Sequence, residues 1–189
     1  MGKHTTGPHD VKGLYNRFHR NLSNSSQHTP WRAGVLTISD LGARGEREDT
    51  SGAAIHEMLS TAGIDVVKYE IVPDERAAIS ARLMDWADRA ALNLIVTTGG
   101  TGLGPRDVTA EATRDAIGYE VPGIAEAMRL EGLKQTAMSM ISRAVAGVRG
   151  RTLIINLPGS PKGVRENLSV VLPVLDHALG LLSGEPTEH

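Results

Sequence analysis

Residues 92–107 read LNLIVTTGGTGLGPRD, an apolar run that leads directly into a glycine-rich loop. The run from Leu92 to Val96 is short and rich in β-favouring side chains, which is typical of a buried strand. The loop contains four glycines, and these lack the Cβ atoms that would keep a ligand away from the backbone. Exposed N–H groups in such a loop form a concave site for an anion. The stretch therefore predicts a buried strand followed by a phosphate-binding turn.

The glycine-rich loop, residues 97–107, matches neither of the two common phosphate-binding patterns. It lacks both the Gly-Lys-Ser/Thr of a P-loop and the Gly-x-Gly-x-x-Gly of a dinucleotide-binding turn. A helix is expected to begin just after it, with Thr109 as its N-cap, and the positive end of that helix would favour an anion. A tight surface turn without a ligand remains the alternative interpretation.

Strand-like and helix-like segments alternate on both sides of this stretch. Strands are expected at 34–38, 64–72, 92–96 and 152–157, and helices at 51–62, 75–90, 110–117, 123–134 and from 162 to about 182, with Pro173 kinking or interrupting the last one. This order is typical of right-handed crossovers and predicts an α/β fold with a parallel sheet. Such sheets bind ligands past the carboxyl ends of their strands, where the strand order reverses.

The loop after the first predicted strand is polar and strongly charged. It begins with Ser39 and Asp40, and the charged residues 44–49 lead to the next predicted helix. Asp40 lies directly at a strand end, which favours a role in a site. Thr50 or Ser51 could act only as a helix cap, with the neighbouring charges solvated.

Two more strand-end loops complete the set. Asp74 follows the second strand at a position typical of a helix N-cap, although capping leaves one carboxylate oxygen free. The loop at 156–162 reads NLPGSPK, and Lys162 is either a charge for phosphate or the solvated side chain of a rigid turn. Asp74 and Asp107 beside a phosphate turn suggest Mg²⁺, which takes oxygen ligands and commonly uses one or two carboxylates.

Composition excludes several classes of function. The 189 residues suit one domain, and the absence of cysteine excludes disulfides and thiolate metal sites. A net charge of -2 and only two Trp, three Tyr and one Phe argue against a nucleic-acid partner. No apolar run approaches the roughly 18 residues of a membrane span, and no secretory signal is recognisable. We therefore expect a cytoplasmic protein without a membrane partner.

The first 30 residues differ from the rest of the chain. They are polar and contain four of the histidines, His4, His9, His19 and His28. Metal binding by these histidines is an alternative, but their spacing follows no regular ligand pattern. We expect residues 1–30 to form a flexible extension and residues 31–189 to form a single α/β domain.

Six segments of the chain resemble, in order, the molybdopterin adenylyltransferase family, the MogA/MoaB-type proteins of molybdenum cofactor biosynthesis. The segments are 36–40, 45–52, 72–75, 97–109 with 111–113, 142–147 and 156–162. The likeness extends over about residues 34–184, and the first 30 or so residues match nothing in the family. A single Thr-Gly-Gly-Thr-Gly would be weak evidence, whereas the ordered set is specific.

The resemblance implies a three-layer α/β sandwich and the reaction of molybdopterin with Mg-ATP, giving adenylylated molybdopterin and pyrophosphate. It implies that Asp74 and Asp107 are catalytic and hold Mg²⁺. It further implies a substrate pocket, undivided between ATP and pterin, that is built from Ser39, Asp40, Thr98, Gly99, Gly100, Thr101, Gly102, Thr109, Glu111, Ser142, Asn156, Pro158, Gly159, Ser160 and Lys162.

The resemblance also bears on assembly and leaves one alternative open. It implies a homotrimer or homohexamer, and it suggests a molybdenum insertion enzyme as a further partner. The segment at 45–52 resembles the MoaB-like branch most closely, and some members of that branch are thought not to be catalytic. A non-catalytic molybdopterin-binding or carrier protein on the same fold is therefore the alternative function, although both aspartates are present.

Overall fold

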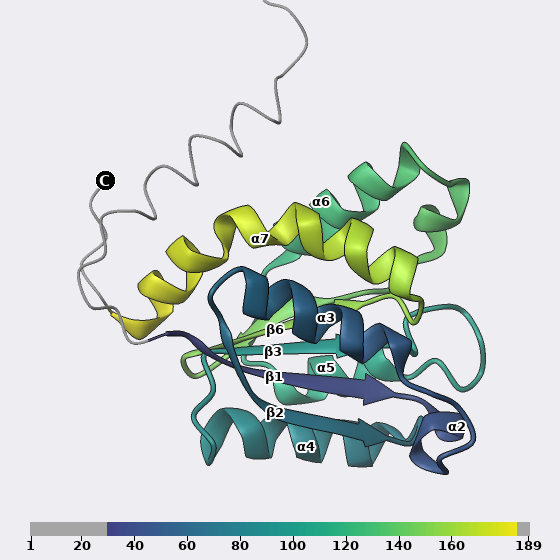
Figure 1. Cartoon of the computed structure of the whole chain (residues 1–189), viewed down its shortest axis with the longest axis horizontal. Helices are drawn as coiled ribbons and strands as arrows, with labels where there is room; N and C mark the ends of the chain where they lie inside the picture. Colours follow the sequence, from purple (N-terminus) through teal and green to yellow (C-terminus); the bar gives the residue numbers. More distant parts are fainter. Residues whose placement is uncertain (1–29, 185–189) are drawn as a thin grey trace, which may run out of the picture.

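A six-stranded sheet forms the centre of the structure, a computed structural model that describes residues 30–184 (Figure 1). The strands are β1 (Arg32–Ile38), β2 (Asp65–Val72), β3 (Leu94–Thr98), β4 (Tyr119–Glu120), β5 (Ala146–Arg149) and β6 (Thr152–Leu157). They lie in the order β2-β1-β3-β6-β5-β4. The first four of these run parallel, whereas β5 and β4 pair antiparallel at one edge. The α/β fold with a mostly parallel sheet is thereby confirmed.

Helices cover both faces of this sheet (Figure 1). They are α2 (Asp40–Ala43), α3 (Thr50–Thr61), α4 (Arg76–Asp88), α5 (Thr109–Ala116), α6 (Pro122–Leu133), the 3₁₀ helix η1 (Ala137–Ile141) and α7 (Pro161–Ser183). One face is covered by α3, α6 and α7, and the other by α4 and α5. The expected three-layer sandwich is therefore present.

The central strands are apolar on both faces because each face packs on a helical layer. All residues of β3 and β6 are buried. Along β3, Leu94 and Val96 enter the core beneath α3 and α7, while Ile95 enters the core beneath α4 and α5. This alternation follows from the two-residue period of a strand. It holds the carboxyl ends of the strands on a rigid base.

The strand order reverses between β1 and β3. The chain passes from β1 through α3 to β2 on one side, and then through α4 to β3 on the other side of β1. The two crossovers diverge, so the loops at the carboxyl ends of β1 and β3 leave a crevice between them. This switch point is the place where a ligand is expected.

Several local features differ from the prediction. The short elements α2, β4, β5 and η1 were not predicted. A kink or an interruption was predicted at Pro173, and α7 continues through this residue without an interruption. Pro173 removes the donor to the carbonyl of Ser169, but both residues are exposed and water can supply that hydrogen bond.

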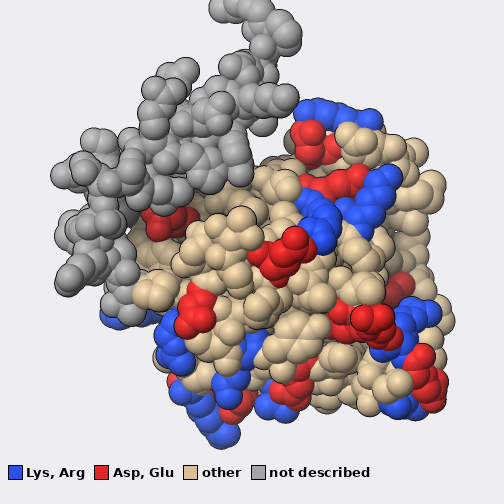
Figure 2. All heavy atoms as spheres, viewed as in Figure 1, with Lys and Arg blue, Asp and Glu red and all other residues tan. Residues whose placement is uncertain are grey.

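The predicted extension, residues 1–30, lies outside the described residues apart from Pro30. Among residues 30–184, no helix is both long and apolar enough to cross a bilayer. On the face seen in Figure 2, lysine and arginine side chains lie beside acidic ones instead of gathering into one basic patch.

Candidate functional site

Four strand-end loops meet around a cleft of about 430 Å³ at the switch point of the sheet. Because β1, β2, β3 and β6 are parallel, their carboxyl ends lie at the same edge, and α3 and α7 begin beside them. The lining combines strand-end residues with the two helix starts: Thr37, Ile38, Ser39, Gly42, Arg47, Glu48, Asp49, Thr50, Ser51, Asp74, Thr98, Gly99, Gly100, Gly159, Ser160 and Pro161.

The glycine-rich loop begins with two residues in a conformation that favours glycine. Gly99 and Gly100 have φ values of 100° and 62°. A Cβ on Gly99 would lie 2.3 Å from the carbonyl oxygen of Ile38, and one on Gly100 would lie 2.3 Å from Oγ1 of Thr109. Both positions therefore require glycine for their backbone angles and for space.

The same loop presents a row of backbone donors. Within residues 30–184, the N–H groups of residues 100–103 donate to no protein acceptor. Successive N–H groups without an acceptor can form an anion-binding nest. Of these four residues, Gly100 lines the cleft. The geometry thus supports the phosphate-binding interpretation of the loop.

Threonines hold this loop in place. Thr109 Oγ1 donates to the carbonyl of Gly99 at 2.8 Å, and the Thr109 N–H donates to Gly100 at 3.1 Å. Thr98 Oγ1 donates to the carbonyl of Pro158 at 2.6 Å. The prediction that Thr109 caps the following helix is wrong: it is the first residue of α5, whose N-cap is Val108. Its hydroxyl instead fixes the turn.

Asp40 and Asp74 connect the ends of β1 and β2 by a reciprocal pair of hydrogen bonds. The N–H of Asp40 donates to Asp74 Oδ2 at 2.8 Å, and the N–H of Asp74 donates to Asp40 Oδ1 at 3.0 Å. The predicted capping role of Asp74 is wrong, because the N-cap of α4 is Glu75, without a side-chain cap. The Asp74 carboxylate binds the first N–H of α2 instead, and Asp74 lines the cleft.

The two carboxyl groups have opposite electrostatic environments. The hydrogen bonds from Arg106, at 2.9 and 3.1 Å, lower the pKa of Asp40. Burial raises the pKa of Asp74, and the negative charges of Asp40 and Asp107 add to that effect. A carboxylate that is partly buried beside other carboxylates gains most from a bound cation.

Asp107 lies against the backbone of the glycine-rich loop. Its Oδ2 accepts from the N–H of Gly104 at 2.7 Å, and a Cβ on Gly102 would lie 2.9 Å from this oxygen. The described part of the chain contains no group of three or more acidic or histidine side chains able to hold a metal. The oxygen donors of Asp74 and Asp107 therefore fit Mg²⁺ only if phosphate and water complete its coordination.

The start of α3 forms the opposite wall, and its role was largely missed from sequence. Asp49 is the N-cap, since its Oδ1 accepts from the N–H of Gly52 at 2.8 Å, so neither Thr50 nor Ser51 is the cap. Ser51 Oγ instead donates to the carbonyl of Gly159 at 3.2 Å across the cleft. An aspartate directly before a helical run is a recognisable capping signal and could have identified Asp49.

The cleft gathers only part of the predicted substrate-binding set. Ser39, Thr98, Gly99, Gly100, Gly159 and Ser160 line it together with Asp74. Asp40, Thr101, Gly102, Asp107, Thr109 and Pro158 belong to the same loops but stand behind or beside the lining.

Four predicted residues lie elsewhere. Asn156 is fully buried and its amide bonds to Thr97, Thr113 and Val145. Glu111 pairs with Arg143, Ser142 Oγ accepts from Ala144 at 3.4 Å, and the Lys162 side chain is 83% exposed beside Glu166.

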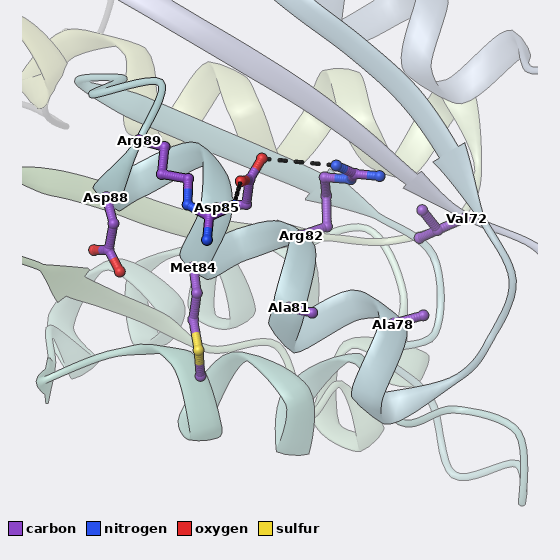
Figure 3. A pocket seen from close by; sticks show the side chains of 8 residues that line it. All are labelled: Val72, Ala78, Ala81, Arg82, Met84, Asp85, Asp88 and Arg89. Carbon is purple, nitrogen blue, oxygen red and sulfur yellow. Dashed lines mark hydrogen bonds and ion pairs between the residues drawn. The ribbon is translucent and has the colours of Figure 1, made fainter.

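A second hollow, of about 570 Å³, lies along the outer side of α4 (Figure 3). Its charged side chains already pair with protein groups: Arg82 with Glu70 at 2.7 Å, Arg89 with Asp85 at 3.2 Å. None of the predicted site residues lines it. Although this hollow is larger, the chemistry gathers at the strand ends.

The fold and the cleft define a class: an α/β protein with a glycine-rich turn at the switch point of its sheet. Residues 34–177 match the family model described as a probable molybdopterin binding domain. A molybdopterin adenylyltransferase from Helicobacter pylori J99 is 44% identical over 153 residues, which cover 80% of this chain and 87% of that protein.

Solved structures agree with this match. The molybdopterin biosynthesis enzyme MoaB from Thermus thermophilus is 59% identical with a TM-score of 0.78, covering 84% of this chain and 99% of that one. A structure of MogA is 42% identical with a TM-score of 0.76, covering 80% and 99%. The chain belongs to the molybdopterin-binding MogA/MoaB family of molybdenum cofactor biosynthesis.

Proposed function

We propose that this protein is a molybdopterin adenylyltransferase, which transfers AMP from Mg-ATP to molybdopterin and releases pyrophosphate. The observation that carries the proposal is the nest of N–H groups at residues 100–103 next to two carboxylates. Asp74 Oδ1 would lie 3.4 Å from a Cβ on Gly100, so the carboxylate borders the nest directly. The identity to the Helicobacter pylori enzyme supports the same activity.

In this reaction, an oxygen of the pterin phosphate bonds to the α-phosphorus of ATP, and the bond from that phosphorus to pyrophosphate breaks. Phosphoryl-type chemistry of this kind depends mainly on positioning and on neutralising charge. The loop N–H groups would hold phosphate oxygens, and Ser39 and Ser160 offer hydroxyl donors around them. Asp74 and Asp107 would hold Mg²⁺, which supplies positive charge to the reacting phosphates when it is bound.

The test is the release of pyrophosphate from Mg-ATP, with and without molybdopterin. Wild-type protein should release pyrophosphate only with the pterin present. Asp107→Asn and Asp74→Asn should each reduce the rate by about 100-fold or more, as expected when charge stabilisation is lost at a transferring group. Circular dichroism should show that both variants keep the wild-type fold. A wild-type rate in Asp107→Asn would contradict the assignment.

A non-catalytic molybdopterin-binding or carrier protein is the second candidate. One observation favours it: Lys162, the cation predicted for phosphate, is 83% exposed and does not line the cleft. Pterin binding without any pyrophosphate release would support this candidate, whereas pterin-dependent release would exclude it.

The proposal carries the family expectation of a homotrimer or homohexamer. Exposed apolar side chains on α6 and η1, namely Leu130, Leu133, Met138, Met140 and Ile141, support association through this region. Light scattering of the full chain would give the oligomeric state. The cytoplasm remains the expected compartment, and a molybdenum insertion enzyme the expected recipient of the product.

A further inference from the structure

Arg143 lies behind the glycine-rich loop and contacts it at several points. Its N–H donates to the carbonyl of Thr101 at 2.9 Å, and its Nε donates to the carbonyl of Gly102 at 2.6 Å. Its Nη2 donates to the carbonyl of Asp107, and its Nη1 donates to Oε1 of Glu111. One residue thus joins the phosphate turn, the second aspartate and the start of α5.

These contacts fix the direction of the loop backbone. In a trans peptide, the carbonyl of one residue points opposite to the N–H of the next residue. Because the carbonyls of Thr101 and Gly102 face Arg143, the N–H groups of Gly102 and Leu103 point away from it. These are two of the donors that find no acceptor among the described protein groups. The backbone N–H of Arg143 therefore binds the carbonyl of Thr101, its guanidinium binds the carbonyl of Gly102, and the N–H groups of Gly102 and Leu103 stay available to a ligand.

Arg143 also spans both ends of the turn that carries Asp107. Gly102 begins this turn and Asp107 ends it, and the N–H of Gly104 donates back to Asp107 Oδ2 at 2.7 Å. The planar fork of a guanidinium can hold two carbonyls at fixed separation, whereas a lysine ammonium acts as a point charge on a flexible stem. Arg143 thus helps to fix the distance between the glycine-rich loop and the Asp107 carboxylate, together with the hydrogen bonds inside the turn.

We propose that Arg143 is a positioning residue, which holds the N–H groups of the glycine-rich loop and the Asp107 carboxylate at the separation that Mg-ATP binding requires. This inference rests on the adenylyltransferase function proposed above. Glu111 acts through Arg143, because its Oε1 accepts a hydrogen bond from the guanidinium and orients it. This role accounts for an acidic residue near the glycine-rich loop that does not line the cleft. Arg143 itself does not line the cleft.

A second arginine provides a matched control. Arg149 is exposed to the same degree as Arg143, 30% against 32%, and it likewise donates to a backbone carbonyl, that of Ala116 at 2.8 Å. Its other partner is the carboxylate of Asp88, and it lies at the opposite edge of the sheet. Its loss removes comparable contacts without touching the loop.

The experiment compares full-length wild-type protein with Arg143→Gln, Arg143→Lys and Arg149→Gln. Hydrogen exchange of the peptide at residues 98–110 measures the order of the loop, and calorimetric titration with ATP at several Mg²⁺ concentrations measures binding. In Arg143→Gln the loop should exchange faster, and Mg-ATP should bind roughly 10–100-fold more weakly, the range found for residues that orient metal ligands. Arg143→Lys should recover only part of either property, and Arg149→Gln should match wild type in both.

The proposal is overturned if the loop of Arg143→Gln exchanges hydrogen at the wild-type rate. It is also overturned if this loop exchanges faster but the variant binds Mg-ATP with wild-type affinity. If the glutamine variant does not fold, the lysine variant decides, because full recovery by lysine would show that charge alone suffices. Absence of Mg-ATP binding by the wild-type protein would count against the proposed function instead, and the exchange of the loop would still show whether Arg143 orders it.

Discussion

The loops at the amino ends of the parallel strands (the amino edge) and those at their carboxyl ends (the carboxyl edge) differ in how their backbone groups are hydrogen-bonded. At the amino edge, Asn93 Oδ1 accepts from the N–H of Arg32 at 2.9 Å, and Thr152 Oγ1 donates to the carbonyl of Leu92 at 2.5 Å. At the carboxyl edge, the N–H groups of residues 100–103 donate to no acceptor within residues 30–184. Side chains complete backbone groups at both edges, as Thr109 and Asp107 do at the carboxyl edge, but the carboxyl edge also has four successive N–H groups without a protein acceptor among the described residues.

This difference distinguishes structure from site. Buried and half-buried backbone groups normally find partners, so we expect a ligand to bind the unpaired donors of the glycine-rich loop. Arg149 and Arg143 show a related contrast: the first binds the carbonyl at the end of α5, and the second binds carbonyls of the glycine-rich loop, whose neighbouring N–H groups have no protein acceptor in the described part of the chain. Substitutions at the two edges should therefore separate stability from ligand binding.

Alanine substitutions of Gly100 and Gly150, which have positive φ at the carboxyl and amino edges, should show the largest difference between the two edges. Gly100→Ala should lower the free energy of unfolding by about 3 kcal/mol, because a Cβ there is strained at φ 62° and meets Thr109 Oγ1 at 2.3 Å. Mg-ATP binding should fall by about 100-fold as the nest opens. Denaturant unfolding and calorimetry would measure the two effects.

Gly150→Ala is the matched control at the amino edge. Gly150 has φ 58°, but a Cβ there would meet nothing within 4 Å. The substitution should cost only about 1 kcal/mol of stability and leave Mg-ATP binding unchanged. If the two alanine variants lost equal stability and equal affinity, the proposed contrast between the edges would be wrong.

Two buried or half-buried asparagines give a smaller contrast. Asn156→Ala should cost about 2 kcal/mol of unfolding free energy, because it leaves the N–H of Val145 without the acceptor at 3.1 Å and removes both threonine contacts. Asn93→Ala should cost about 1 kcal/mol or less, since water can reach the exposed Arg32 N–H. Equal losses in urea unfolding would argue that burial of Asn156 is unimportant.

Much of this architecture follows from local sequence. The apolar runs at 94–98 and 152–157 are buried on both faces and so appear as strands, and glycines at 99 and 100 mark a turn that only they can form. The strands β4 and β5, of two and four residues, are too short to carry a periodic signal. Their pairing is created by the tertiary fold.

The site was harder to predict in detail than its location. The side chains of Asn156 and Glu111 are of types that often bind ligands. In the folded protein, however, Asn156 bonds to Thr97 and Glu111 pairs with Arg143, because tertiary packing decides which way each side chain faces. Arg143 reaches carbonyls 36 and 41 residues earlier in the chain, and no local pattern encodes such a contact. Types of residues at strand ends thus indicate a site, whereas orientation depends on the whole fold.

Tyr69 binds the N-cap of α3, the helix that forms one wall of the cleft. Its hydroxyl and that of Thr37 each donate to Asp49 Oδ2 at 2.5 Å, and burial together with this carboxylate raises the pKa of Tyr69. Tyr69→Phe should lower stability by about 0.5–1 kcal/mol near neutral pH. The contribution of the hydroxyl is present below the ordinary tyrosine pKa and is lost as pH rises through the raised pKa. Unfolding at alkaline pH should therefore bring variant and wild type together, and a constant difference would contradict this account.

The substitutions Asp74→Asn and Asp88→Asn, at opposite ends of the parallel strands, should change the melting temperature in opposite directions. These are the smallest effects that we predict. In Mg²⁺-free buffer at neutral pH, Asp74→Asn should raise the melting temperature by about 1–2 °C. The asparagine keeps an acceptor for the N–H of Asp40 but removes a partly buried charge that Asp40 and Asp107 repel. Because the folded pKa of Asp74 is raised, its ionisation costs stability as pH rises through that value. The gain should shrink in acid, where wild-type Asp74 is protonated.

Asp88→Asn should do the reverse. The hydrogen bonds from Arg149 lower the pKa of Asp88, so its stabilising effect is present above the ordinary aspartate pKa and is lost as pH falls through the lowered one. The variant should therefore melt slightly below wild type at neutral pH, and thermal unfolding across the acid range would show the difference closing. A rise for Asp88→Asn together with a fall for Asp74→Asn would mean that the carboxyl edge holds its charges for stability, which removes the electrostatic reason to place a cation there.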